Sequence, residues 1–236
     1  MVAPVTGGAP RDLLPDLDGH VTDFDWKDGK TLLWLADTGV KTGFGLVKLD
    51  GEEAEAPFDQ GKRGPIMYSV RLSEDGARMA LLAETPTHQR EVDAAGGSSP
   101  GFRRLTDSNP WLRDVSLATQ RVVRWKARDD LDLEGLFIEP LHDGLGNPPP
   151  LIMIAHGGPE GHRRNGWLTR YSAPGQVAAA RGYAVFYPNY RGSTGRGVEF
   201  SKLGQSDAAG KEFDDVVDAV DALVAAGIAD DERVGV

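Results

Sequence analysis

Cysteine, long apolar runs and excess positive charge are all missing from this sequence. Without cysteine the chain can form neither a disulfide nor a thiolate metal site, which fits a reducing compartment and predicts a cytoplasmic protein. No apolar stretch approaches the roughly 18 residues that a membrane span needs, so we expect no membrane contact. Acidic residues outnumber basic ones by 36 to 26, and the net charge of -10 argues against a nucleic-acid partner. Residues 1–19 lack the basic start and apolar run of a signal peptide.

The residues that are present suit a folded protein with two parts. With 236 residues, 40% of them hydrophobic, the chain is long enough to bury a sizeable core in one or two domains. The pattern changes near residue 120, where short alternating runs give way to longer apolar strands and helical spacing.

The first part predicts antiparallel strands joined by tight turns. Short alternating runs between about residues 21 and 106 are broken by Gly, Asp and Pro. Two Asp-Gly pairs, Asp28-Gly29 and Asp75-Gly76, each separate two such runs and predict a hairpin. Asp75 follows Asp28 by 47 residues, close to the repeat of about 40 to 50 residues in a β-propeller blade. By itself this repeat fits two blades or an ordinary β-meander equally well.

The second part predicts an α/β sheet under construction. Residues 120–138 indicate a hairpin that turns at Arg128-Asp129-Asp130. Residues 151–155 (LIMIA) and 183–187 (YAVFY) are continuously apolar, which is typical of strands covered on both faces. A segment compatible with a helix around residues 176–180 lies between them, so the order is hairpin, strand, helix, strand.

A last helix and a last strand complete this pattern. Asp207 is the predicted N-cap, Gly227 the predicted C-terminal glycine, and a strand is expected to begin at Arg233. The acidic residues of the helix, Asp215, Asp218 and Asp221, are expected on a solvated face. The apolar positions that recur at helical spacing and predict its buried face are Phe213, Val216, Val217, Val220, Leu223 and Val224.

Several motifs in the second part are specific in combination. They are residues 104–110 (RLTDSNP), 156–159 (HGGP), 181–195 (RGYAVFYPNYRGSTG) and the helix that contains Glu212 and Asp215. With them the chain resembles the prolyl oligopeptidase family, especially its acylaminoacyl-peptidase-like and dipeptidyl-peptidase-like branches. In that family an N-terminal β-propeller caps an α/β-hydrolase domain. The resemblance implies that residues 1–119 form about the last two blades of a partial propeller and residues 120–236 the N-terminal part of the hydrolase sheet.

The same resemblance implies an oxyanion-stabilising loop directly after the strand at residues 151–155. A tetrahedral intermediate concentrates negative charge on one oxygen, and fixed backbone N–H groups stabilise that charge without reorganising. Glycine lets a backbone approach closely, so His156, Gly157 and Gly158 are the candidate catalytic residues, with a glycine amide as donor. Some branches place a donating tyrosine at the position of His156, whereas this chain has histidine.

The nucleophile of such a hydrolase sits in a G-x-S-x-G elbow between a strand and a helix. That elbow would follow the strand that begins at Arg233, and the acid and histidine of the triad come later still, so we expect the triad beyond Val236 and a truncated, inactive fragment. Residues 97–101 (GSSPG) match the elbow formally, with Ser99 as nucleophile. We assign them to a loop instead, since Pro100 has no N–H to offer an oxyanion.

Other polar residues support weaker predictions. His20, His88, His142 and His162 show no metal-ligand spacing and are expected at the surface or in loops. Arg191 and Glu212 match family positions and could order the loop near the site, although a structural ion pair is the favoured interpretation. Arg163 and Arg164 could contact substrate or belong to an exposed loop.

These observations predict a serine-type peptidase that cleaves oligopeptides by acyl transfer and needs neither a metal nor another cofactor. Its partners would be a peptide substrate and, in a homo-oligomer, further copies of the chain. A carboxylesterase of the same fold is an alternative, because an HGG loop serves esters equally well. A noncatalytic fragment that binds a partner through an open sheet edge is a second alternative.

Overall fold

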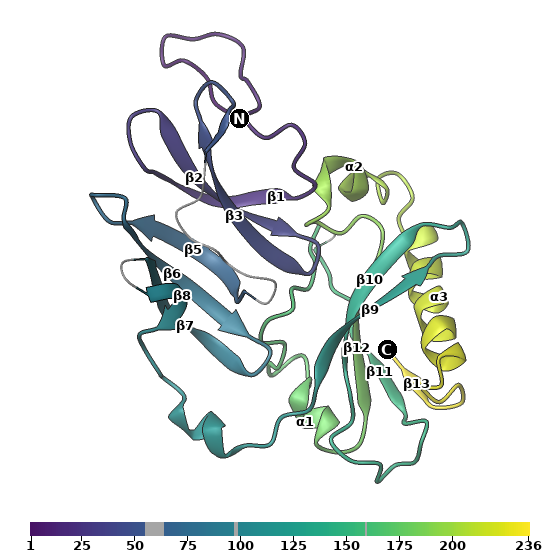
Figure 1. The fold of residues 1–236 in the computed structure, drawn as a ribbon. Coiled ribbons are helices and arrows are strands. Elements are labelled where there is room, and N and C mark those ends of the chain that lie inside the picture. The colour runs from purple at the N-terminus through teal and green to yellow at the C-terminus, as the bar shows by residue number, and fades with distance from the viewer. Residues whose placement is uncertain (55–63, 97–98, 159) are drawn as a thin grey trace.

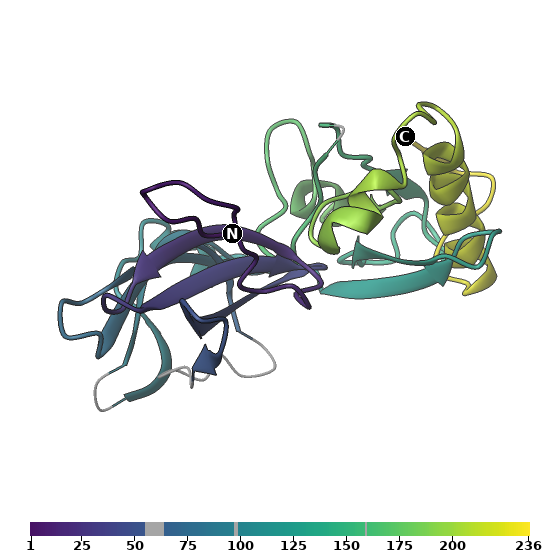
Figure 2. The same ribbon diagram turned by 90° about the horizontal axis from the view of Figure 1, so that it is seen from above.

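Three β-sheets organise the chain, and Figure 1 shows the two antiparallel sheets on one side of the molecule and the mixed sheet on the other. The structure is a computed structural model that describes residues 1–54, 64–96, 99–158 and 160–236. Viewed from above in Figure 2, the two sides meet along a narrow region, and α3 lies at the far edge of the mixed-sheet side. Among the described residues, no helix combines the length and apolarity that a bilayer crossing requires.

The first two sheets are each four-stranded and antiparallel, with neighbours in chain order. The first contains β1 (His20–Trp26), β2 (Thr31–Thr38), β3 (Lys41–Lys48) and β4 (Glu53–Ala54). The second contains β5 (Ile66–Leu72), β6 (Arg78–Thr85), β7 (His88–Gly96) and β8 (Ser99–Arg104). Both predicted Asp-Gly hairpins are confirmed, because β1 pairs with β2 across Asp28-Gly29 and β5 pairs with β6 across Asp75-Gly76.

Alternating side chains hold these two sheets face to face. In β6, Met79, Leu81 and Ala83 point into the shared core while Ala80 and Leu82 are exposed. This alternation is the period of two that the sequence pattern indicated. The buried core between the sheets consists of Leu33, Leu35, Phe44, Leu46, Met67, Val70, Met79, Leu81, Ala83 and Ala95.

A short 3-10 helix, η1 (Pro110–Asp114), leads from the second sheet to the mixed sheet. The mixed sheet has the order β13-β11-β12-β10-β9, in which β13, β11 and β12 are parallel and β10 and β9 form an antiparallel hairpin. Its strands are β9 (Gln120–Lys126), β10 (Asp132–Ile138), β11 (Leu151–Met153), β12 (Ala184–Asn189) and β13 (Val234–Gly235). The turn predicted at Arg128-Asp129-Asp130 is confirmed, because it joins β9 to β10 and Asp130 has a left-handed φ of 66°.

Helices cover both faces of this sheet. α1 (Gln176–Ala179) packs with Leu136, Val185 and Tyr187 on one face. α2 (Gly197–Lys202) and α3 (Lys211–Ala225) contribute Phe200, Ala219 and Leu223 to the core on the other face. The helix predicted around residue 176 is confirmed. α2 was not expected, because the glycines on either side of it hide the helical signal.

The end of β11 and the start of α3 differ from the predicted boundaries. β11 ends at Met153, because the chain leaves the sheet after the N–H of Ile154 donates to Phe186 O at 2.8 Å, and Ala155 is already exposed. The N-cap residue of α3 is Gly210 and not Asp207. Asp207 still caps the helix from outside, since its carboxylate accepts the N–H of Lys211 at 3.0 Å.

The predicted buried face of α3 is partly wrong. Phe213 is 61% exposed and Val217 51% exposed, whereas Asp215 is wholly buried. The solvated-face prediction also fails for Asp218, whose carboxylate receives the Arg128 guanidinium at 2.8 Å and is 11% exposed. The helix is therefore rotated relative to its apolar pattern, so that Asp215 points into the protein. At its end the prediction holds, because Gly227 follows the helix with a φ of 70°.

A buried ion-pair network explains this rotation. The guanidinium of Arg191, 5% exposed, donates to Asp215 from Nε at 2.9 Å and from Nη2 at 2.6 Å. It donates to Asp129 at 2.8 and 2.9 Å. The backbone N–H of Arg191 also donates to Asp215, at 2.8 Å. Because both carboxylates bind it in pairs of hydrogen bonds, the pKa of Arg191 is raised and that of Asp129 is lowered.

This Arg191 network predicts a large effect of one substitution. Asp215→Asn leaves the buried guanidinium with only the half-exposed Asp129, so we expect the free energy of unfolding to fall by about 3 to 5 kcal/mol. Urea unfolding followed by circular dichroism measures this loss. The matched control is Asp214→Asn, whose carboxylate pairs with Arg128 at the surface and should cost less than about 1 kcal/mol. Equal losses in the two variants would contradict the role of the network.

Candidate functional site

The predicted oxyanion loop leaves the sheet at the carboxyl end of β11. His156, Gly157 and Gly158 follow three residues after Met153, and the next parallel strand, β12, ends nearby at Asn189. The carboxyl ends of parallel strands are where open α/β sheets place their ligands. Pro159, the last residue of the predicted motif, lies outside the described residues. The structure thus places the three candidate residues at the carboxyl end of the parallel strands, where a ligand is expected to bind.

The side chain of His156 holds this loop to the segment after β12. Its ring is buried and stacks on the ring of Tyr190, with centroids 4.4 Å apart and an angle of 10° between the planes. His156 Nε2 lies 2.9 Å from Ser193 Oγ, and the Ser193 hydroxyl donates to Tyr190 O at 2.5 Å. Because that hydroxyl has one hydrogen, the ring must be the donor to Ser193. The hydroxyl of Tyr190 donates to His156 O and completes the frame.

The ring of His156 is neutral at pH 7. Burial, reinforced by the positive charge of Arg163, lowers the pKa of His156 to about 4. In this tautomer the only N–H of the ring donates to Ser193, so the ring positions the loop and does not point a free donor at a substrate.

The amides of Gly157 and Gly158 are the free donors of the loop. Both residues are exposed, and neither N–H donates a hydrogen bond to any residue in the described ranges. Gly158 has a φ of 156°, and an added Cβ would lie 3.1 Å from the backbone of Glu160. Gly157 has open space where a Cβ would be. Glycine is therefore required by the backbone at Gly158, whereas at Gly157 it leaves the approach to the amide unobstructed.

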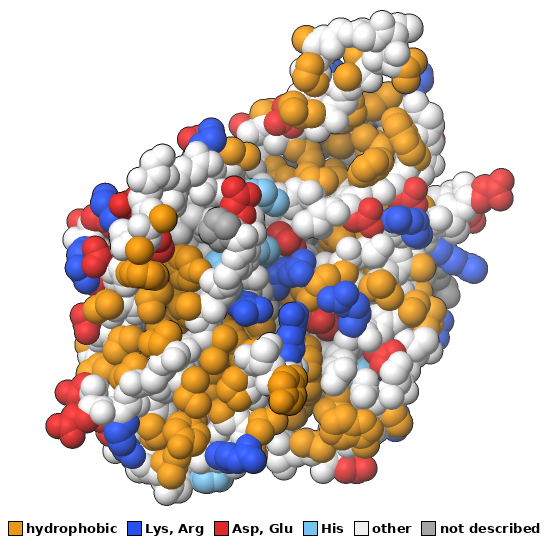
Figure 3. Space-filling view, turned by 180° about the vertical axis from the view of Figure 1, so that it is seen from behind, with side chains coloured by type: hydrophobic (Ala, Val, Ile, Leu, Met, Phe, Trp, Pro, Cys, Tyr) orange, Lys and Arg blue, Asp and Glu red, His pale blue; other side chains and the backbone are white. Residues whose placement is uncertain are grey.

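A polar junction fixes the other end of this loop to the first sheet. Arg164 donates to Asp37 of β2 at 3.0 Å, and His162 Nε2 lies 3.6 Å from the same carboxylate. Gly195 donates its N–H to His20 Nδ1 at 2.9 Å and accepts the N–H of Gly39 at 2.5 Å. In Figure 3, Lys, Arg and His side chains gather between the two sides of the molecule. His162 lies in a loop, as predicted, but its side chain is not at the surface, because it is buried in this junction.

The junction changes how two of its groups titrate. Burial, together with the charge of Arg164, lowers the pKa of His162 to about 4. Burial raises the pKa of Asp37, although the charge of Arg164 opposes this shift. His162 is therefore neutral at pH 7. Its Nδ1 lies 2.8 Å from Thr194 Oγ1, within hydrogen-bonding distance.

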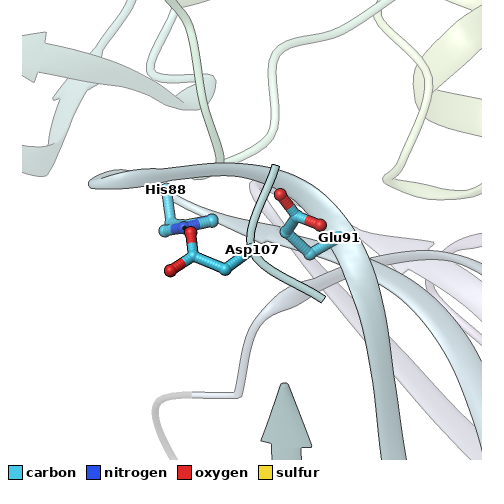
Figure 4. Close-up of side chains that lie close together, drawn as sticks. All are labelled: His88, Glu91 and Asp107. Carbon is cyan, nitrogen blue, oxygen red and sulfur yellow. Dashed lines mark hydrogen bonds and ion pairs between the residues drawn. The ribbon is translucent and has the colours of Figure 1, made fainter. Parts of the chain in front are cut away.

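A second group of ligand-type side chains lies away from the loop. Figure 4 shows His88 and Glu91 on β7 facing Asp107 of the segment that crosses it. Their ligand atoms all lie within 4.8 Å of one another, a proximity that the sequence spacing did not reveal. Protein partners already occupy the carboxylates: Glu91 accepts the N–H of Ser108 at 2.6 Å and the hydroxyl of Thr106, and Asp107 pairs with Arg113. We assign the cluster to joining β7 to the segment that follows β8.

Two other residues that the sequence singled out are Ser99 and Glu212. Ser99 begins β8 and does not lie in a loop, which corrects that prediction, while Gly97 and Ser98 lie outside the described residues. Because β8 pairs with β7 and is not followed by a helix at Ser99, this segment is not a strand-to-helix elbow. Glu212 does not pair with Arg191; its Oε1 accepts the N–H of Ala209 at 2.5 Å, and its buried Oε2 has no partner among the described residues.

Comparison with solved structures identifies the class of protein. The chain superimposes on the Pyrococcus horikoshii acylaminoacyl peptidase with a TM-score of 0.77 and 26% identity, over 95% of this chain and 34% of that one. An acylaminoacyl peptidase in complex with Z-Gly-Gly-Phe-chloromethyl ketone matches with a TM-score of 0.77 and 27% identity, over 97% of this chain and 34% of that one. The fold is thus that of peptidases built from a β-propeller and an α/β-hydrolase domain.

Sequence comparison gives the family. Residues 169–236 match the model described as "Prolyl oligopeptidase family". The dipeptidyl aminopeptidase BIII of Pseudoxanthomonas mexicana is 33% identical over 181 residues, which are 73% of this chain and 25% of that protein. The chain belongs to the prolyl oligopeptidase family, as its motifs indicated, and it spans about a quarter of the curated relative and a third of the solved ones.

The two buried histidines predict how stability depends on pH. In the unfolded chain their pKa has the ordinary value of 6.5, whereas in the folded chain it is about 4 for both His156 and His162. The unfolded state therefore binds more protons between these values, and stability falls as the pH is lowered through 6.5 toward 4. We expect a loss of about 3 kcal/mol for each histidine across the whole window.

Urea unfolding at several pH values between 7 and 5 measures this dependence. The double variant His156→Gln, His162→Gln should flatten the curve, and His142→Gln, a change at an exposed histidine, should leave it as in the wild type. A double variant that lost stability with acid as steeply as the wild type would show that other groups carry the dependence.

Proposed function

We propose that this chain is part of a serine-type peptidase that cleaves oligopeptides by acyl transfer, with the His156–Gly158 loop supplying a donor of the oxyanion site. The observation that carries the proposal is the pair of exposed amides of Gly157 and Gly158, which donate to no described residue and follow a parallel strand of the hydrolase sheet. The charge that develops on a carbonyl oxygen during acyl transfer needs such preorganised donors.

The domain division is the second part of the proposal. We assign residues 1–119 to a partial propeller and the two four-stranded antiparallel sheets to its last blades. Residues 120–236 form the first part of the hydrolase domain. The strand order in each sheet, with neighbours in chain order, supports the assignment to blades. A propeller beside the loop would limit access to short or unstructured peptides.

The nucleophile is assigned to residues outside this sequence. Within the 236 residues, the formal elbow match at Ser99 lies on a β-strand, and β13 is the strand from which the true elbow would follow. In the proposed mechanism a serine hydroxyl adds to the substrate carbonyl while a histidine takes its proton, and the amine leaves with that proton. Water then hydrolyses the acyl-enzyme, and the loop holds the oxyanion in both steps.

The names of the relatives support peptides as substrates, because they describe dipeptidyl and acylaminoacyl peptidases. A peptide chloromethyl ketone is bound in one of the matched structures. We further propose a cytoplasmic location, on the absence of cysteine, and a homo-oligomer formed through open sheet edges as an arrangement to be tested by light scattering.

The first experiment reads the coding DNA past the codon for Val236 and assays the complete reading frame. An elbow in the next strand-to-helix turn, together with hydrolysis of aminoacyl anilides, would support the peptidase. Turnover of nitrophenyl esters alone would favour the carboxylesterase, and a stop codon directly after Val236 would favour a noncatalytic binding role. The 236-residue chain by itself should show no turnover.

One substitution tests the loop in that complete protein. Gly158→Ala places a methyl group 3.1 Å from the Glu160 backbone at a φ that disfavours alanine, so the amide shifts. Loss of one oxyanion donor costs about 100-fold or more in kcat, and we expect a loss of this order with a smaller change in KM. Gly29→Ala, in the first Asp-Gly turn, also meets open space, lies outside the loop and is the control that should keep the activity. Full activity in Gly158→Ala would remove the loop from the mechanism.

A further inference from the structure

Two hydrogen bonds hold the backbone of Arg163 at the carboxyl end of the parallel strands, the end at which the oxyanion loop also lies. Its N–H donates to Asn189 Oδ1 at 2.7 Å, and Asn189 Nδ2 donates to Arg163 O at 2.9 Å. Asn189 is buried and ends β12. The position of Arg163 relative to the carboxyl ends of the parallel strands is therefore fixed by two hydrogen bonds to a buried side chain.

The side chains of the two adjacent arginines have different surroundings. Arg164 is ion-paired with Asp37 and lies over the ring of Tyr68 at 4.2 Å, so it serves the junction. Arg163 has no carboxylate partner and donates no side-chain hydrogen bond within the described part of the chain. Its Nε is buried without an acceptor. The guanidinium carbon lies 5.9 Å from the centroid of the Tyr187 ring, whose buried hydroxyl has no described partner either.

The charges near Arg163 are unfavourable for it. Burial and the positive charge of Arg170 lower its pKa, and its own charge in turn contributes to the lowered pKa of the His156 ring. A partly buried cation without an anion is costly, because it has lost water and gained no partner. An anionic group of a bound molecule would remove this cost.

We propose that Arg163 binds a carboxylate of the substrate beside Gly157 and Gly158, and so sets a preference for peptides with an acidic group close to the scissile bond. The inference rests on the proposed peptidase function for the class of substrate. Guanidinium is suited to the role, because its planar fork can donate two parallel hydrogen bonds to one carboxylate. The carboxylate can come from an acidic side chain or from a free C-terminus.

Binding of small probes to the 236-residue chain tests this assignment without any turnover. The probes are N-acetyl-aspartate amide, with a side-chain carboxylate, N-acetyl-alanine, with a terminal one, and the neutral N-acetyl-asparagine amide. NMR titration of the arginine Nε–H signals should detect one or both carboxylate probes and show much weaker binding of the amide. The stronger of the two carboxylate probes identifies the source of the group.

Variants assign the binding to Arg163. Arg163→Gln should weaken carboxylate binding about tenfold or more, since a charged hydrogen-bond pair is lost. The affinity of Arg163→Lys should lie between those of the wild type and Arg163→Gln, because lysine keeps the charge but lacks the planar fork. Arg103→Gln, an exposed arginine of β8, is the matched control and should bind as the wild type does. Unchanged thermal midpoints would show that both glutamine variants fold.

The proposal is overturned if the aspartate and asparagine probes bind equally, if neither carboxylate probe binds, or if Arg163→Gln binds like the wild type. None of these outcomes affects the peptidase proposal, which is tested by hydrolysis of neutral anilides. Conversely, absence of hydrolysis in the complete protein would leave a measured carboxylate site in place and remove only its assignment to a peptidase substrate.

Discussion

The charge of Arg191 is the constraint on which the mixed sheet and its site depend. A buried guanidinium requires carboxylates at hydrogen-bonding distance, and this one receives Asp215 from α3 and Asp129 from the hairpin turn of β9 and β10. Three segments that are far apart in the sequence must therefore converge on one side chain. Tyr190 directly precedes Arg191, so the same convergence places the ring that stacks on His156 and holds the candidate oxyanion loop.

The junction adds a second constraint, from the other side of the molecule. Asp37 of the first sheet binds Arg164 and His162, while Gly39 donates to Gly195. The loop is thus held between two parts of the chain, by the Arg191 network at one end and by the first sheet at the other. This arrangement explains how an antiparallel sheet that carries none of the candidate catalytic residues contributes to the geometry of the site.

Much of the fold could be predicted because its signals are local. The turn at Asp75-Gly76, the turn at Arg128–Asp130 and the glycine after α3 each contain a residue in a left-handed backbone conformation that few residue types adopt. The apolar strands and the HGG loop could also be recognised, and the family that they indicated is confirmed. The errors lie where the outcome depends on distant partners, as in the exposure of Phe213 and the burial of Asp215.

The sequence by itself determined the turns, the alternation of the strands, the family and the place of the candidate oxyanion loop, since each depends on neighbouring residues and their chemistry. Only the tertiary structure decided which charges are paired. Arg163 and Arg164 are adjacent and identical in type, yet Arg164 meets Asp37, 127 residues away, and Arg163 meets no carboxylate in the described part of the chain. Pairing of charges depends on distance in space, and a linear pattern contains no information about which distant carboxylate the fold brings close.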